Sequence, residues 1–176
     1  MFRHTYTNIL ILTQTPNSLE KPNWTVQLLN RITPDEVYIA SRTLWLDKQI
    51  AYRIAEDALE IIAKTYMRKF SFFNGKTSRG LVGGLFYLLG YKHNVVKNQK
   101  ELADRLGTTD VTIRASYRNW LETFPDLFLD VISKLGQDPN LRYYVLTDLK
   151  QKISAYQLFA THGQQIIATE QAGPNV

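Results

Sequence analysis

Two short amphipathic segments joined at a glycine, between Asn98 and Leu121, constrain this chain more than any other feature. The first segment opens with Asn98, which can cap free backbone N–H groups, and has Glu101 three residues later at the capping-box position. Gly107 follows it, and glycine is favoured where a helix ends in the left-handed backbone conformation. The pattern predicts a helix-turn-helix, in which two short helices meet at a steep angle.

The second helix of this pair is predicted to begin after Thr109, whose hydroxyl can cap its first turn. At about 100° per residue, one side of the helix is apolar and the opposite side carries two arginines. The apolar side comprises Ile113, Tyr117, Trp120 and Phe124, with Leu121 at its margin. The opposite side comprises Val111, Arg114, Ala115 and Arg118. A buried helix would not tolerate the two arginines, so we expect this second side to be exposed.

The side with the arginines has the chemistry that base edges in a DNA major groove require. A guanidinium can donate two hydrogen bonds to guanine, and a small apolar side chain can pack on a thymine methyl group. We therefore predict base reading by Val111, Arg114, Ala115 and Arg118. Residues near the starts of the two helices are predicted to contact the DNA backbone: Lys97, Gln99, Lys100, Thr109 and Thr112.

Two longer helices with clear start signals are predicted upstream. Thr33, followed by Pro34 and by Glu36 at the capping-box position, predicts a helix of about three turns. Asp47 can cap the next helix, whose apolar residues recur at helical spacing and which is expected to end near Lys69.

A third helix is predicted over residues 79–90, beginning after Thr77 or Ser78, and it is almost wholly apolar beyond its first turn. A helix that is apolar all round belongs in the middle of a domain. Gly83 and Gly84 lie inside it, and each costs roughly 1 kcal/mol relative to alanine in a helix. They indicate either an unusually close helix crossing or a local kink, and the sequence leaves both open.

A small set of stretches carries a resemblance to a known family. These are Asp110-Val111-Thr112-Ile113-Arg114, Ser116-Tyr117-Arg118, Pro125-Asp126-Leu127-Phe128, Gln99-Lys100-Glu101 and Leu85-Phe86. Through them, residues 34–128 resemble the cyclin-like repeat of the general transcription initiation factor IIB family, in particular its second repeat. The resemblance implies a mainly α fold, a single cyclin-like five-helix domain ending in a helix-turn-helix. It also implies that Val111 and Arg114 align with the family's principal readers of a promoter element beside the TATA box.

Two features depart from that family's usual organisation. The chain contains no cysteine, so the zinc ribbon that docks on RNA polymerase is expected to be absent. Its 176 residues leave room for one repeat rather than two. The resemblance implies the TATA-binding protein and the RNA polymerase machinery as partners, and these departures leave both open. One reading helix makes a small footprint, so we expect a homodimer or a partner chain to complete it.

The segments outside the resemblance are predicted to be extensions. The predicted order is an N-terminal extension, the helix-turn-helix domain, a C-terminal extension and a flexible tail, at residues 1–32, 33–128, 129–171 and 172–176. Residues 6–13 and 141–146 have a β-favouring composition, which predicts two short strands that could pair in a small sheet. An extra C-terminal helix is predicted from Asp148 to about residue 169.

Composition favours an acidic partner. The formal net charge is +5 and the pI is near 9.4, values that suit nucleic acid. Five cations near the junction of the second and third predicted helices could follow a phosphate backbone, with a solvated charged face as the alternative: Lys64, Arg68, Lys69, Lys76 and Arg79. No apolar run approaches the roughly 20 residues needed to cross a bilayer, so we expect an intracellular protein without membrane contact.

No constellation of residues indicates an enzyme. The histidines have no neighbouring cysteine and no metal-ligand spacing, and they are His4, His93 and His162. The stretch Gly75-Lys76-Thr77 resembles the end of a phosphate-binding loop, yet Phe70 occupies the position of the required first glycine. We therefore expect no catalytic residue, no metal and no cofactor.

Two functional classes compete for this sequence. The first is sequence-specific binding of double-stranded DNA in transcription, as a regulator or a partial initiation factor. The second is a protein-docking module, because the cyclin fold is also a binding platform and steep helix pairs occur in domains that never touch nucleic acid. The face formed by Val111, Arg114 and Arg118 discriminates between them, since docking gives no reason for base-reading chemistry there.

Overall fold

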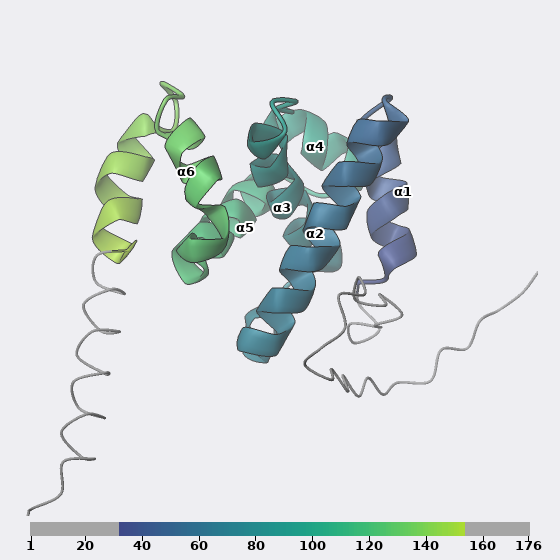
Figure 1. Cartoon of the computed structure of the whole chain (residues 1–176), viewed down its shortest axis with the longest axis horizontal. Helices are drawn as coiled ribbons and strands as arrows, with labels where there is room; N and C mark the ends of the chain where they lie inside the picture. Colours follow the sequence, from purple (N-terminus) through teal and green to yellow (C-terminus); the bar gives the residue numbers. More distant parts are fainter. Residues whose placement is uncertain (1–31, 154–176) are drawn as a thin grey trace, which may run out of the picture. The chain divides into compact units, whose positions relative to one another are not determined.

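The computed structural model of the chain describes residues 32–153. These residues are mainly helical and form no β-sheet, which confirms the predicted mainly α fold class. The elements, in chain order, are α1 (Pro34–Leu44), α2 (Lys48–Arg68), η1 (Phe70–Phe73), α3 (Ser78–Lys92), α4 (Gln99–Leu106), α5 (Asp110–Thr123), η2 (Pro125–Phe128), α6 (Leu129–Leu135) and η3 (Tyr144–Leu149) (Figure 1). The η1 and η2 elements are 3₁₀ turns, and η3 is a π-helical stretch.

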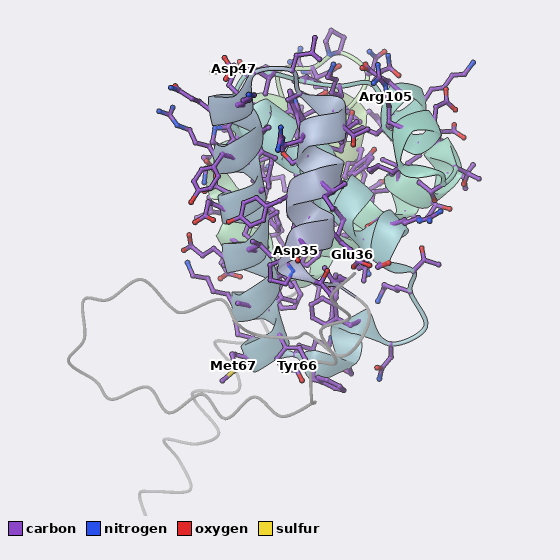
Figure 2. All side chains as sticks on the ribbon, turned by 90° about the vertical axis from the view of Figure 1, so that its right-hand side faces the viewer. Asp35, Glu36, Asp47, Tyr66, Met67 and Arg105 are labelled. Carbon is purple, nitrogen blue, oxygen red and sulfur yellow. The ribbon has the colours of Figure 1, made fainter. Side chains whose placement is uncertain are left out.

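Helices α1 and α2 pack side by side and begin at the predicted capping residues (Figure 1). The Thr33 hydroxyl accepts the backbone N–H of Glu36 at 3.2 Å, and the Glu36 carboxylate accepts the Thr33 N–H at 3.0 Å. The Asp47 carboxylate accepts two backbone N–H groups of the first turn of α2. Figure 2 shows Glu36 and Asp47 at the starts of their helices. Buried Ser41 joins the two helices by donating to the Ala51 carbonyl at 2.6 Å.

Helix α3 is buried along nearly its whole length, as its apolar sequence predicted. Thr77 caps its start, and every residue from Gly80 to Tyr91 is buried. Trp45, which follows α1, packs edge-on against Phe86 with ring centroids 5.5 Å apart. The Trp45 indole also donates to the Val95 carbonyl at 3.1 Å. These contacts tie the end of α1 to α3 and to the loop that leads into α4.

The structure consists of two compact units, and the boundary between them falls inside α5, between Arg118 and Asn119. The first unit contains α1 to α4 and most of α5. The second contains the last residues of α5 together with η2, α6 and η3. Buried side chains of the second unit include Trp120, Leu121, Phe124, Phe128, Val131 and Leu135.

The strand predicted at 141–146 is wrong, because this segment lies in a helical run that covers residues 142–153. The predicted C-terminal helix therefore begins before Asp148. Residues buried at helical spacing explain the difference, and they are Leu141, Tyr144, Val145 and Leu149. Packing of these side chains overrides the β-favouring composition of the segment. Helix α6 had no predicted counterpart, and the elements predicted at 6–13, beyond residue 153 and at 172–176 lie outside the described residues.

Candidate nucleic-acid interface

Helix α4 begins and ends where its sequence predicted, but only the Asn98 half of the expected capping box forms. The side chain of Asn98 accepts the backbone N–H of Glu101 at 2.7 Å. Gly107 ends the helix with φ +65° and ψ +46°, in the left-handed region that favours glycine. The carboxylate of Glu101 accepts from the Lys97 ammonium at 2.8 Å, so it is directed at Lys97. Gly107 thus ends α4, and α5 starts three residues beyond it.

Helix α5 is capped by Thr109 and buries the predicted stripe. The Thr109 hydroxyl accepts the backbone N–H of Thr112 at 3.1 Å, and the two hydroxyls lie 2.8 Å apart. The five residues of the stripe are each no more than 3% exposed, and they are Ile113, Tyr117, Trp120, Leu121 and Phe124. The buried side of α5 is thus fixed by packing.

The glycines inside α3 serve a close crossing with α5, which answers the question that the sequence left open. A Cβ added to Gly84 would lie 2.6 Å from the Cβ of Ser116 and 2.7 Å from the backbone nitrogen of Tyr117. A Cβ on Gly83 would collide with the side chain of Ile113. One turn earlier, a Cβ on Gly80 would lie 2.7 Å from the methyl group of Thr112. The side of α3 that carries Gly80, Gly83 and Gly84, which we call the glycine face, therefore forms the seat of α5, that is, the surface against which α5 packs.

The outer side of α5 carries the residues predicted to read bases. Val111 is 63% exposed, and Arg114 and Ala115 are also exposed. Arg118 differs from the expectation of an exposed residue, because its side chain is half-buried and its Nε atom is buried. The exposed part of the predicted reading face is thus centred on the first half of the helix.

Arg114 is held by two neighbours, one on each helix of the pair. Its Nε donates to the side-chain oxygen of Gln99 on α4 at 3.2 Å. Its terminal nitrogen lies 3.5 Å from the carboxylate of Asp110, one turn earlier on α5. An exposed ion pair at this helical spacing contributes only about 0.3–0.5 kcal/mol. The bond to Gln99 can therefore orient the guanidinium, while the weak ion pair with Asp110 can be exchanged for a stronger contact.

The residues predicted to contact the DNA backbone lie at the starts of α4 and α5. They differ in whether their side chains already bond to other residues of the protein. Lys100 is exposed, whereas Lys97 pairs with Glu101. Gln99 bonds to Arg114, a contact that the sequence did not indicate. The remaining two, Thr109 and Thr112, bond to each other at the start of α5.

The cations predicted to gather at the α2–α3 junction have separate environments. Lys64 pairs with Glu60 at 2.5 Å. The ammonium of Lys76 donates to the backbone carbonyl of Phe72 and lies 4.4 Å from the centroid of the Phe72 ring. Burial, followed by the charge of a neighbouring lysine, lowers the pKa of Lys76. Arg79 does not join the other cations at the α2–α3 junction. Its guanidinium lies over Gly107, at the turn between α4 and α5. Only the fold brings Arg79 to this turn, so no local sequence signal could have placed it there.

Nothing in residues 32–153 assembles a metal centre. This part of the chain contains no group of three or more histidine, cysteine, aspartate or glutamate residues that could hold a metal ion. Of the three histidines, His93 is described, and its Nε2 lies 2.8 Å from the carboxylate of Asp57. Lys92 also lies 2.8 Å from that carboxylate, so the three groups form a small polar cluster. No helix in the described part of the chain is long and apolar enough to cross a membrane.

Comparison with known proteins finds similarity over part of the chain. Over 65 residues the chain is 42% identical to the transcription initiation factor IIB of Aeropyrum pernix, a match that covers 37% of this chain and 20% of that protein. No protein-family model and no solved structure matches the chain. The chain therefore contains a region similar to transcription initiation factor IIB, as the motifs around α5 indicated.

Proposed function

We propose that this protein binds double-stranded DNA in a sequence-specific manner and acts in transcription, with α5 as the helix that enters the major groove. The proposal assigns it no enzymatic activity. The proposal is supported by the partial similarity to a transcription initiation factor and by the basic net charge of +5. It requires a helix that is fixed on one side and free on the other.

The observation that carries this proposal is the division of α5 into two sides with different chemistry. Its inner side is seated on the glycine face of α3, where the backbone of Tyr117 approaches Gly84 closely. Its outer side exposes Val111, Arg114 and Ala115 near the start of the helix. In helix-turn-helix proteins, the first residues of the second helix contact base edges while the first helix crosses the backbone. The exposed residues of α5 occupy the corresponding part of the helix.

Arg114 is the central base reader in this proposal. Its Nε would keep the bond to Gln99, while its terminal nitrogens would exchange the contact to Asp110 for two hydrogen bonds to the O6 and N7 atoms of a guanine. Val111 would pack on a thymine methyl group, and Ala115 would let the helix approach the base pairs. Arg118 would take a smaller part, because less of its side chain is exposed. Lys100, Thr109 and Thr112 would contact phosphates that flank the groove, beside Lys97 and Gln99.

The partners proposed beyond DNA are inferred from the protein to which this chain is similar. The similar protein is named as a transcription initiation factor, and this chain spans 20% of its length. We therefore infer that this protein works at promoter DNA beside the initiation machinery, in which the TATA-binding protein and RNA polymerase are the candidate contacts. A single reading helix gives a small interface, so a second copy or a partner chain would strengthen it.

The direct test is selection of bound duplexes from a random DNA pool by the full chain, in parallel with its Arg114→Ala variant. The wild-type protein should enrich a short motif. The variant should lose about 1–3 kcal/mol on that motif and accept any base at one position. Lys100→Ala is the matched control, and it should weaken binding to all sequences alike. Equal losses on selected and random duplexes for Arg114→Ala would contradict base reading.

A protein-docking module is the second candidate, and exposed apolar side chains on α1, on α2 and in the loop between them favour it. Ile39 is 66% exposed and Leu46 is 98% exposed. Tyr52 stacks on Tyr38 with ring centroids 5.7 Å apart, and it is also exposed. On this alternative, partner binding would be insensitive to Arg114→Ala and would fall on Tyr52→Ala. Enrichment of no motif, with partner binding lost in the Tyr52 variant, would select the docking function.

A further inference from the structure

Arg79 lies outside the helix-turn-helix in the sequence but reaches its turn in the structure. It belongs to the first turn of α3 and its side chain is exposed. Its Nη1 atom lies 3.0 Å, and its Cζ atom 3.9 Å, from the position that a Cβ on Gly107 would occupy. The guanidinium therefore lies directly over the glycine that ends α4.

The first turn of α3 also borders the start of α5. A Cβ on Gly80 would lie 2.7 Å from the methyl group of Thr112, so the residue next to Arg79 touches the first turn of α5. The hydroxyl of Thr112 bonds to that of Thr109, the residue that caps α5. Arg79 thus precedes a residue that packs against Thr112, and its guanidinium lies over Gly107, two residues before Thr109.

Arg79 differs in its ion pairing from other basic residues of this part of the structure. Lys97 pairs with Glu101, Arg114 with Asp110, and Lys64 with Glu60. Among residues 32–153, no carboxylate pairs with Arg79. A guanidinium presents five donors in a planar fork that suits the oxygens of a phosphate. An exposed arginine at this turn therefore has donors to offer to an anionic partner.

We propose that Arg79 contacts the phosphate backbone of the bound DNA, so that the DNA-binding surface extends from the helix-turn-helix onto α3. This inference rests on the proposed function, because it takes α5 to lie in the major groove. With α5 in the groove, the turn before it faces the sugar–phosphate chain at the groove edge. Arg79 then adds one cation to the set that neutralises phosphates, without reading sequence.

The test compares the full chain with Arg79→Ala and Arg79→Lys on the selected duplex and on a random duplex, between 50 mM and 200 mM salt. Loss of one phosphate contact should weaken Arg79→Ala equally on both duplexes. It should also reduce the slope of log affinity against log salt by about 0.9. Over this fourfold range of salt, the affinity of the wild-type protein should fall by a factor about 3.5 times larger than that of Arg79→Ala. Arg79→Lys should keep the wild-type slope, because it keeps the charge.

Arg53→Ala is the charge-matched control, since Arg53 is exposed on α2, outside the helix-turn-helix. It should have the wild-type slope. Thermal unfolding of the Arg79 variants should match that of the wild-type protein, which separates a lost contact from a damaged turn.

The outcomes distinguish this inference from the function on which it rests. If wild-type protein and Arg114→Ala behave as base reading requires but Arg79→Ala keeps the wild-type slope, only the role of Arg79 is overturned. A loss confined to the selected duplex would also overturn it, because a phosphate contact acts on all sequences. If the wild-type protein binds neither duplex, the proposed function and the role of Arg79 are overturned together.

Discussion

The close crossing of α3 and α5 makes Gly84→Ala the most informative single substitution. In an isolated helix this change would be favourable by about 1 kcal/mol, because alanine has a higher helix propensity than glycine. In this structure the new Cβ would lie 2.7 Å from the backbone nitrogen of Tyr117 and 2.6 Å from the Cβ of Ser116. A backbone atom cannot rotate away, so α5 itself must shift.

Overpacking of this kind typically costs 1–3 kcal/mol, and here the neighbour is rigid, so we place the cost at about 2–3 kcal/mol. Subtracting the gain of about 1 kcal/mol in helix propensity leaves a net loss of about 1–2 kcal/mol in the free energy of unfolding. Urea titration followed by far-ultraviolet circular dichroism would measure it. DNA affinity should fall as well, because the shift displaces the helix that carries Arg114.

Gly136→Ala is the matched control for this substitution. Gly136 has φ −66°, which any residue adopts, and a Cβ there would have its nearest neighbours at 3.6 Å, an ordinary contact distance. This variant should be neutral or more stable by about 0.4–1 kcal/mol. If Gly84→Ala were as stable as Gly136→Ala, the two helices could not cross as closely as described, and the account of the α5 seat would be wrong.

Three further substitutions test the turn and the reading face. Gly107→Ala forces a Cβ into a left-handed conformation and should lower the free energy of unfolding by about 1–2 kcal/mol in urea titration. Thr109→Ala removes the cap that accepts the Thr112 N–H and should cost about 1 kcal/mol in the same assay. Gln99→Ala should leave unfolding unchanged but weaken binding to the selected duplex more than to a random one, because Arg114 loses a neighbour that orients it. Equal weakening on both duplexes would return Gln99 to a pure backbone role.

Local signals predicted much of the first unit. The starts of α1, α2 and α4 follow from Thr33, Asp47 and Asn98, and the end of α4 follows from Gly107, because capping groups and a left-handed glycine act within one helical turn. The buried stripe of α5 and the buried position of α3 follow from apolar periodicity for the same reason. Each of these features depends on residues that are close together in the sequence, so it could be predicted without the tertiary structure.

Features that depend on packing between distant residues escaped prediction. Tyrosine and valine favour strands in isolation, yet Tyr144 and Val145 are buried in a helical run. The orientation of Arg79 toward Gly107 depends on how α3 meets the turn before α5, and no sequence period encodes that distance. The bond between Arg114 and Gln99 likewise joins two helices whose crossing sequence patterns do not specify. The predicted reading residues are therefore better defined than the contacts that orient them.

The seat of α5 on α3 has a consequence for how this protein can diverge. Residues 84 and 116 share one space, and a side chain at position 84 would also meet the backbone nitrogen of Tyr117, so position 84 cannot enlarge unless the two helices separate. Related chains with alanine at position 84 should therefore hold α5 farther from α3, and a smaller residue at position 116 would limit the separation. The separation changes how far Arg114 extends from the protein surface. A position that never touches DNA would then tune affinity for it, and the two positions should covary among relatives that share a target site.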